Sequence, residues 1–206
     1  MDIISILTKV GAIMQNSHFV GVSGLHMDTY ITKDALFPHV FKVEKVCRMF
    51  AEKNKDLNID VVAAPALGGI ILSQGTAYAL SKNLGKEVLA VFTEKTLDGN
   101  QVFTRGYDKY IKEKNVLVLE DLVTTGGSVQ KIIKSVQGAG GEVVAVSVMV
   151  NKSPDTVNAD LFKIPFNALG ELTVNTYEAK NCPMCKAGIP INTTFGHGKK
   201  YLESKK

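Results

Sequence analysis

Apolar residues recur along the chain with two different periods, and these predict an alternation of helices and strands. Apolar positions three or four residues apart predict helices over Asp2–Gln15 and over Pro38–Asn54, the second beginning at a proline. Beyond these, short apolar runs bounded by glycine or proline predict buried strands, and amphipathic stretches between them predict helices. The strands are expected at residues 60–64, 87–92, 116–119 and 142–150, and the helices at 70–82 and 127–137.

Two segments interrupt this alternation. Ser17–Phe37 contains two glycines and alternating apolar positions, which predicts short strands and turns. Lys95–Tyr110 is polar and glycine-containing, which predicts a loop or hairpin. The alternation elsewhere predicts an α/β protein with a central parallel sheet and helices on both faces. In such sheets ligands bind beyond the carboxyl ends of the strands.

Composition narrows the class of protein. A chain of 206 residues, 45% hydrophobic and 21% charged, fits one globular domain and excludes wholesale disorder. The net charge of +4 is too small to indicate a dedicated nucleic-acid binder, and it suits a small polyanionic ligand equally well. No apolar run is long enough to cross a membrane, and three cysteines are too few for a secreted disulfide framework. We therefore expect a cytoplasmic protein with no membrane or nucleic-acid partner.

The stretch from Val116 to Ser128 carries the clearest chemistry. An apolar strand ends in Glu120 and Asp121, and a loop rich in threonine, glycine and serine leads into a helix. Glycines let backbone N–H groups approach a ligand, hydroxyls add donors, and the helix N-terminus favours an anion. The alternative is a simple strand-to-helix turn with a good N-cap. The acidic pair directly after the strand favours a phosphate site whose carboxylates face a diol or a hydrated Mg²⁺.

Residues 116–129 resemble the phosphoribosyl-pyrophosphate (PRPP) binding motif of type I phosphoribosyltransferases. The resemblance implies that family's fold, in which a small hood covers a central parallel sheet flanked by helices. It implies that Glu120 and Asp121 hold the ribose hydroxyls of PRPP and that Thr124 to Ser128 hold its 5′-phosphate. The loop residues expected to contact PRPP are Leu122, Val123, Thr124, Thr125, Gly126, Gly127 and Ser128.

Two further segments are similar to parts of that family. Residues 64–69 resemble its pyrophosphate loop, which implies that Ala66, Leu67 and Gly68 present backbone N–H groups to the leaving group. Residues 94–106 resemble its mobile loop, in which Lys95 and Arg105 neutralise pyrophosphate and Lys95 is catalytic beside the acidic pair. The resemblance also implies Mg²⁺ bound mainly through PRPP, and a homodimer in which this loop acts on the partner subunit's site.

The identity of the acceptor base rests on the hood. Residues 17–31 are similar to the hood of the family's orotate-specific branch, which implies that Ser23, Gly24 and Tyr30 contact the base. Two positions depart from that branch: Val22 stands where a lysine is common, and Asn151-Lys152 where Asp-Arg is common. Lys152 neutralises a carboxylate without the bidentate fork of arginine. Orotate is the expected acceptor, with two alternatives: salvage of a purine or other base, and a PRPP-sensing regulator without catalysis.

The expected domain organisation is a single domain with a core at residues 38–164 and a hood at 16–37 and 165–206. Cys182 and Cys185 have the Cys-x-x-Cys spacing of one half of a zinc site, and Cys47 and His197 are the plausible additional ligands. Buried structural thiols are favoured over a metal or a redox disulfide, so no metal ligand is assigned. The remaining histidines are expected on the surface or in the hood rather than as ligands, namely His18, His26 and His39.

Overall fold

The computed structural model describes residues 2–21 and 23–205, so the expectation for Val22 lies outside the described residues. The α-helices of the described residues are α1 (Ile3–Lys9), α2 (Val40–Lys53), α3 (Gly68–Leu84), α4 (Gly127–Gly138), α5 (Ala159–Phe162), α6 (Pro183–Lys186) and α7 (Gly198–Glu203). The strands are β1 (Ile13–Met14), β2 (Phe19–Val20), β3 (His26–Met27), β4 (Tyr30–Ile31), β5 (Val61–Pro65), β6 (Leu89–Lys95), β7 (Gln101–Val102), β8 (Asn115–Val123), β9 (Glu142–Asn151), β10 (Phe166–Glu171) and β11 (Thr176–Tyr177). No helix in the described part of the chain is long and apolar enough to cross a membrane.

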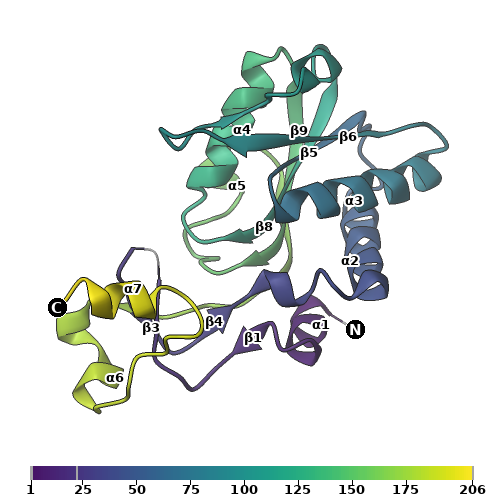
Figure 1. Cartoon of the computed structure of the whole chain (residues 1–206). Coiled ribbons are helices and arrows are strands. Elements are labelled where there is room, and N and C mark those ends of the chain that lie inside the picture. Colours follow the sequence, from purple (N-terminus) through teal and green to yellow (C-terminus); the bar gives the residue numbers. More distant parts are fainter. Residues whose placement is uncertain (1, 22, 206) are drawn as a thin grey trace.

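A six-stranded sheet forms the centre of the molecule (Figure 1). Its strand order is β10-β9-β8-β5-β6-β7, and all neighbours are parallel except β7, which pairs antiparallel with β6. This confirms the predicted parallel sheet and the hairpin after β6. It also places β5 directly beside β8, so the loops that follow these two strands lie at the same edge of the sheet.

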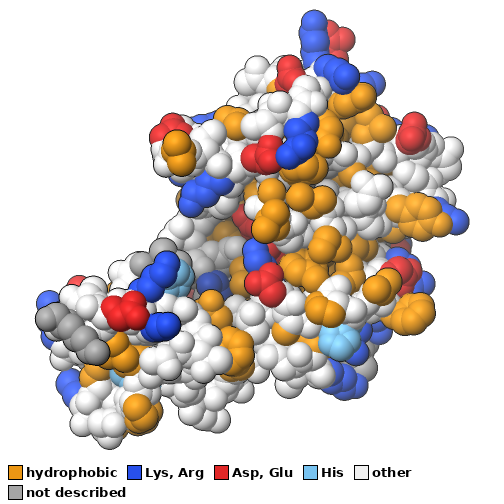
Figure 2. All heavy atoms as spheres, viewed as in Figure 1, with side chains coloured by type: hydrophobic (Ala, Val, Ile, Leu, Met, Phe, Trp, Pro, Cys, Tyr) orange, Lys and Arg blue, Asp and Glu red, His pale blue; other side chains and the backbone are white. Residues whose placement is uncertain are grey.

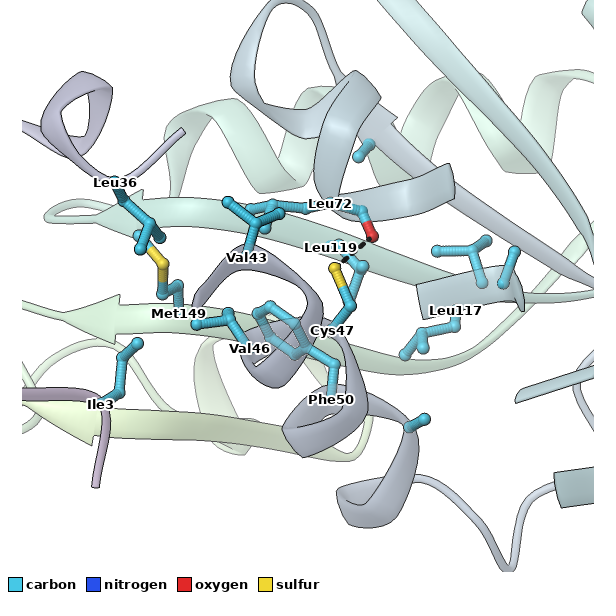
Figure 3. Packing of buried hydrophobic residues seen from close by; sticks show 14 of the residues in the cluster. Ile3, Leu36, Val43, Val46, Cys47, Phe50, Leu72, Leu117, Leu119 and Met149 are labelled. Atoms are coloured by element: carbon cyan, nitrogen blue, oxygen red, sulfur yellow. Dashed lines mark hydrogen bonds between the residues drawn. The ribbon is translucent and has the colours of Figure 1, made fainter. Parts of the chain in front are cut away.

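Side chains of β8 alternate between two hydrophobic cores, which explains its continuous apolar run. Leu117 and Leu119 pack with α1, α2 and α3 on one face of the sheet, and Figure 3 shows them beside Phe50 and Leu72. Val116 and Val118 pack on the opposite face with α4. Burying each such side chain contributes about 1.5–3 kcal/mol. The sheet that positions the site is therefore stabilised from both sides.

The first helix is shorter than its pattern predicts. Asp2 caps α1 by accepting a hydrogen bond from the Ser5 backbone N–H at 2.9 Å. The helix ends at Lys9, and Gly11 then adopts a positive φ of 71° that turns the chain into β1. The apolar residues at 13 and 14 continue the helical spacing by coincidence and belong to a strand.

Both ends of the chain build the hood, the lobe at the lower left of Figure 1. It contains the antiparallel sheet β11-β3-β2 together with α6 and α7, and β1 pairs with β4 beside it. The expected hood boundary at residue 165 differs from the structure, because β10 pairs with β9 as part of the central sheet. The C-terminal hood segment therefore begins after Glu171.

Candidate active site

The acidic pair lies inside β8 rather than just after it, because β8 pairs with β9 as far as Val123. The side chains of Glu120 and Asp121 are buried. Glu120 Oε1 accepts a hydrogen bond from the Asp121 backbone N–H at 3.1 Å, and Asp121 Oδ1 accepts one from the Leu122 N–H at 2.7 Å. The pair is therefore held in place before any ligand binds.

The loop after β8 forms an open cradle at the start of α4. Thr124, Thr125 and Ser128 are exposed, so their hydroxyls are accessible to a ligand. Gly126 precedes the helix with a positive φ of 77°, and an added Cβ there would lie 2.8 Å from Leu161 Cδ2. Glycine is required at this position on both grounds. The N-terminus of this 12-residue helix provides the free N–H groups that suit a phosphate.

The loop after β5 approaches the acidic pair across the sheet edge. A cis peptide bond joins Ala66 to Leu67, and Gly68 begins α3. A Cβ added at Gly68 would lie 2.7 Å from Asp121 Oδ2, so the two loops predicted from separate motifs meet at one place. One expected donor is already used, because the Ala66 N–H donates to the Thr93 carbonyl at 2.8 Å. Backbone donors for a ligand must come from the following residues.

Replacing Gly68 with alanine is expected to lower kcat/KM about tenfold to a hundredfold and also to reduce thermal stability, because an added Cβ would lie 2.7 Å from Phe37 Cζ as well. The new methyl group pushes on the Asp121 carboxylate, and displacements of this size at a reacting centre have such effects. Steady-state kinetics and thermal unfolding measure both quantities. Gly138→Ala is the matched control, since that helical glycine has no atom within 4 Å of an added Cβ. Equal activity of the two variants would contradict the close approach of Gly68 to the Asp121 carboxylate.

Burial gives Glu120 an unusual proton affinity. Desolvation, followed by the neighbouring Asp121 charge, raises the pKa of Glu120 from 4.5 to about 8. The Asp121 N–H, Lys33 and Ser128 act in the opposite direction without cancelling the rise. Burial therefore favours the neutral form of Glu120 in the free protein, and a neutral carboxyl group is able to donate as well as accept a hydrogen bond.

The stability of the free protein is expected to contain a contribution from Glu120 that falls as pH rises. The folded protein binds this proton more tightly than the unfolded chain, so the contribution is fully present below pH 4.5 and is lost up to about pH 8. Glu120→Gln removes the titrating group and keeps a neutral side chain of the same shape. The difference in unfolding free energy between wild type and this variant, measured by denaturant titration from pH 4.5 to 8, should therefore change with pH. A constant difference would contradict the assignment.

Lys33 belongs to the site, although the sequence offered no motif for it. It follows β4, and its Nζ forms an ion pair and hydrogen bond with Asp121 Oδ2. Burial alone would lower the pKa of Lys33, but Asp121 and Glu120 outweigh this effect and raise it. These residues are 88 positions apart, and no local pattern distinguishes this lysine from the others.

Lys152 lies at the same edge as the acidic pair. Its backbone N–H donates to the Val123 carbonyl at 2.9 Å, which continues the β8–β9 pairing into the loop. Burial lowers the pKa of Lys152, and the Asp121 charge opposes this effect. The preceding Asn151 is buried and donates to the Val157 carbonyl at 2.8 Å, so it shapes the turn. Of these two residues, Lys152 is the one available for a ligand.

The predicted mobile loop forms the β6–β7 hairpin, which makes contacts within its own subunit. Lys95 lies at the end of β6 and is exposed, whereas Arg105 pairs with Glu94 at 3.1 Å. From α4, Lys131 Nζ donates to the Gly99 carbonyl at 2.6 Å and holds the tip of the hairpin. In this conformation Lys95 is the more available of the two expected cations.

The hood residues that we expected to contact the nucleobase lie apart from the acidic pair. Ser23 and Gly24 lie in the β2–β3 turn, where Gly24 has a positive φ of 78°. Tyr30 packs on Phe19 with ring centroids 5.5 Å apart. Among the described residues, no hydrogen bond or ion pair joins this group to the acidic pair. The structure therefore brings together the two loops, Lys33 and Lys152, but does not bring the hood residues to them.

The three histidines lie on the surface or in the hood, as expected, but two of them are buried there. His39 is exposed at the start of α2, as expected. His18 and His26 lie in the hood, but they are each only 1% exposed and their ring nitrogens face each other and the two hood cysteines. Folding of the β2–β3 hairpin against α6 buries them, which local spacing does not reveal.

Comparisons with known proteins agree with this geometry. A family model of the phosphoribosyl transferase domain matches residues 35–167. The orotate phosphoribosyltransferase of Caldanaerobacter subterraneus subsp. tengcongensis is 40% identical over 179 residues, covering 87% of this chain and 88% of that protein. The orotate phosphoribosyltransferase of a Thermoanaerobacter species is also 40% identical, over 191 residues, covering 92% of this chain and 94% of that protein.

A solved structure shares the fold. The crystal structure of Mycobacterium tuberculosis orotate phosphoribosyltransferase aligns with a TM-score of 0.66 at 22% identity, covering 84% of this chain and 97% of that one. This confirms the α/β architecture expected from the strand–helix alternation.

Proposed function

Because the chain belongs to the phosphoribosyltransferase family, we propose that it transfers the phosphoribosyl group of PRPP to orotate, releasing pyrophosphate and forming orotidine 5′-monophosphate. Two relatives at 40% identity carry this activity in their names, and the match covers most of their length. The observation that carries the proposal is the approach of Gly68 to Asp121, which brings the loop after β5 against the acidic pair that precedes the cradle.

In this proposal each part of PRPP has its own partner. The 5′-phosphate lies in the cradle from Thr124 to Ser128, at the N-terminus of α4. Asp121 and Glu120 hold the ribose hydroxyls, and the neutral Glu120 is able to donate a hydrogen bond as well as accept one. Pyrophosphate lies against the Leu67–Gly68 backbone, where the 17-residue helix α3 begins.

The acidic pair suits sugar hydroxyls better than direct coordination of Mg²⁺. Both oxygens of Asp121 already accept hydrogen bonds, from Leu122 and Lys33, and burial favours the neutral form of Glu120. Mg²⁺ therefore fits as an ion held mainly by the phosphate oxygens of PRPP, where it supplies positive charge for the leaving group.

The reaction places opposite charges on the two halves of PRPP. The orotate ring nitrogen forms a bond to C1 of the ribose as the bond from C1 to the pyrophosphate oxygen breaks, with inversion at C1 and release of the ring proton. Positive charge develops on the ribose beside Asp121, and negative charge grows on pyrophosphate beside the α3 N-terminus. Lys95 closes over pyrophosphate and excludes water, so catalysis is electrostatic and positional.

Lys152 is the proposed partner of the orotate carboxylate. Lys152→Met keeps the apolar stem but removes the charge, so the KM for orotate is expected to rise about tenfold to a hundredfold. The KM for PRPP should change much less. Lys152→Arg is the matched control and should retain most of the affinity for orotate. Equal increases of both KM values in Lys152→Met would place this lysine on PRPP instead.

A pyrophosphate-release assay with PRPP and Mg²⁺ tests the acceptor directly. Orotate, uracil, adenine, hypoxanthine and guanine are compared under the same conditions, and release is expected with orotate. Release only with another base would keep the family and overturn the acceptor. PRPP binding without release for any base would favour a PRPP-sensing regulator.

We also propose a homodimer, supported by an apolar face on α2 and α3. Val40, Phe41 and Tyr78 are exposed there, with Phe41 89% exposed, beside a groove of about 810 Å³ between the two helices. Figure 2 shows hydrophobic side chains gathered over these helices. Exposed apolar patches of this kind are typical of subunit interfaces. The cytoplasmic location stays a prediction, supported by three free thiols.

A further inference from the structure

The hood contains a cluster of two histidines and two cysteines that the proposed reaction does not use. His18 precedes β2 and His26 begins β3, whereas Cys182 and Cys185 lie at α6, near the other end of the chain. One ligand atom from each of the four residues lies within 4.8 Å of all the others. Among the described residues, these are the only histidine, cysteine or acidic side chains that gather in this way.

Three nitrogen–sulfur distances in the cluster are close to those of a tetrahedral metal site. His18 Nε2 lies 3.6 Å from Cys182 Sγ and 3.8 Å from Cys185 Sγ, and His26 Nδ1 lies 3.4 Å from Cys185 Sγ. Nitrogen and sulfur ligands of one tetrahedral zinc ion are about 3.5 Å apart. The two imidazole nitrogens are 2.7 Å apart and would separate by roughly half an ångström on binding the ion.

Surrounding contacts orient two of the ligands. His18 Nδ1 lies 2.7 Å from the Ile189 carbonyl oxygen, so it carries the proton and donates. The lone pair of His18 Nε2 then points into the cluster, as in metal sites with a supporting carbonyl. The Cys185 backbone N–H is directed at Cys182 Sγ at 3.4 Å. This contact stabilises negative charge on the sulfur, which a metal-bound thiolate carries.

We propose that His18, His26, Cys182 and Cys185 bind one zinc ion. A set of two imidazoles and two thiolates in a closed, mostly buried arrangement selects zinc in a tetrahedral structural site. The cluster contains Cys182 and Cys185 but neither Cys47 nor His197, the two additional ligands that the sequence suggested. Cys47 lies in the core and directs its thiol to the Leu72 carbonyl, and His197 precedes α7 outside the cluster.

The ion joins segments that are distant in sequence. Each contact between a histidine and a cysteine of the cluster joins residues that are 159 to 167 positions apart in the sequence. Closing so long a segment constrains the unfolded chain and fixes the C-terminal part of the hood on the β2–β3 hairpin. The ion is therefore structural, because all four of its coordination positions are filled by protein side chains.

Metal analysis of the untagged full-length protein tests the proposal independently of the enzymatic function. After gel filtration, elemental analysis should find about one zinc per chain. Cys182→Ser and His26→Gln should lose the zinc, whereas Cys47→Ala and His39→Gln are matched controls that should retain it. Folded wild-type protein without zinc that also fails to take up added Zn²⁺ or Co²⁺ would overturn the site.

A second measurement keeps the test valid if the cysteine variants fail to fold. Zinc is removed from wild-type protein with a chelator, and Co²⁺ is added as a spectroscopic probe. Tetrahedral coordination with two thiolates should produce both ligand-field absorption and sulfur-to-metal charge transfer. Removal of zinc should lower Tm by roughly 5 °C or more, and readdition should restore it. A spectrum without the charge-transfer band, or a disulfide between Cys182 and Cys185 in the reduced preparation, would contradict the proposal.

Discussion

Asp121→Asn is expected to lower kcat/KM about a thousandfold, the largest effect of a single substitution in this protein. Asp121 Oδ1 accepts a hydrogen bond from the Leu122 N–H, and Oδ2 accepts one from Lys33. An amide at this position must direct its NH₂ group at one of these two donors, whichever way it turns. The variant therefore loses the negative charge beside the developing positive charge on the ribose, and it also loses the hydrogen bond from either Lys33 or the Leu122 N–H. Steady-state kinetics with PRPP as the varied substrate measure the loss.

Asp60→Asn provides a matched control for this substitution. Asp60 has the same set of partners, accepting from Lys86 Nζ at 2.8 Å and from the Asn115 N–H at 3.1 Å. It precedes β5, so it lies at the opposite edge of the sheet from the site. Both variants should lose stability, but only Asp121→Asn should lose activity. A comparable loss of activity in Asp60→Asn would mean that the effect arises from general destabilisation.

Lys95→Ala is expected to lower kcat about a hundredfold to a thousandfold while changing the KM for PRPP much less. The ammonium group is exposed in the free protein and is proposed to reach pyrophosphate only when the hairpin closes. An interaction made mainly in the transition state affects kcat rather than KM. Lys55→Ala is the control, because Lys55 is an exposed lysine paired with Glu52 away from the site. An unchanged kcat in Lys95→Ala would remove this lysine from the mechanism.

Mixing two inactive variants tests whether Lys95 acts on the partner subunit. In a mixed dimer of a Lys95→Ala chain and an Asp121→Asn chain, each site takes Asp121 from one chain and Lys95 from the other. One of the two sites then has both residues intact, and the other has lost both. Random association then restores about a quarter of the wild-type sites. If Lys95 acts on its own chain, every site retains one defect and activity stays at the level of the separate variants.

Much of the fold was predictable, because periodicity and turn residues act over a few neighbouring positions. The alternation of short apolar runs and amphipathic stretches predicted the parallel strands and the helices on both faces. The elements that differ are those for which tertiary pairing overrides a local pattern. Pairing with β9 extends β8 through Glu120 and Asp121, and it also brings β10 into the central sheet. Gly11 ends α1 before its apolar spacing does.

By itself, the sequence determined the chemistry that lies in one continuous segment. The acidic pair, the glycine-containing cradle and the helix after it are adjacent in the chain, so their order is visible without a structure. Only the tertiary structure decided which distant residues meet. Lys33 pairs with Asp121 across 88 positions, and the cysteines of α6 reach His18 across 164 and 167. Such contacts depend on how sheets and loops pack in space, and spacing along the chain carries no record of them.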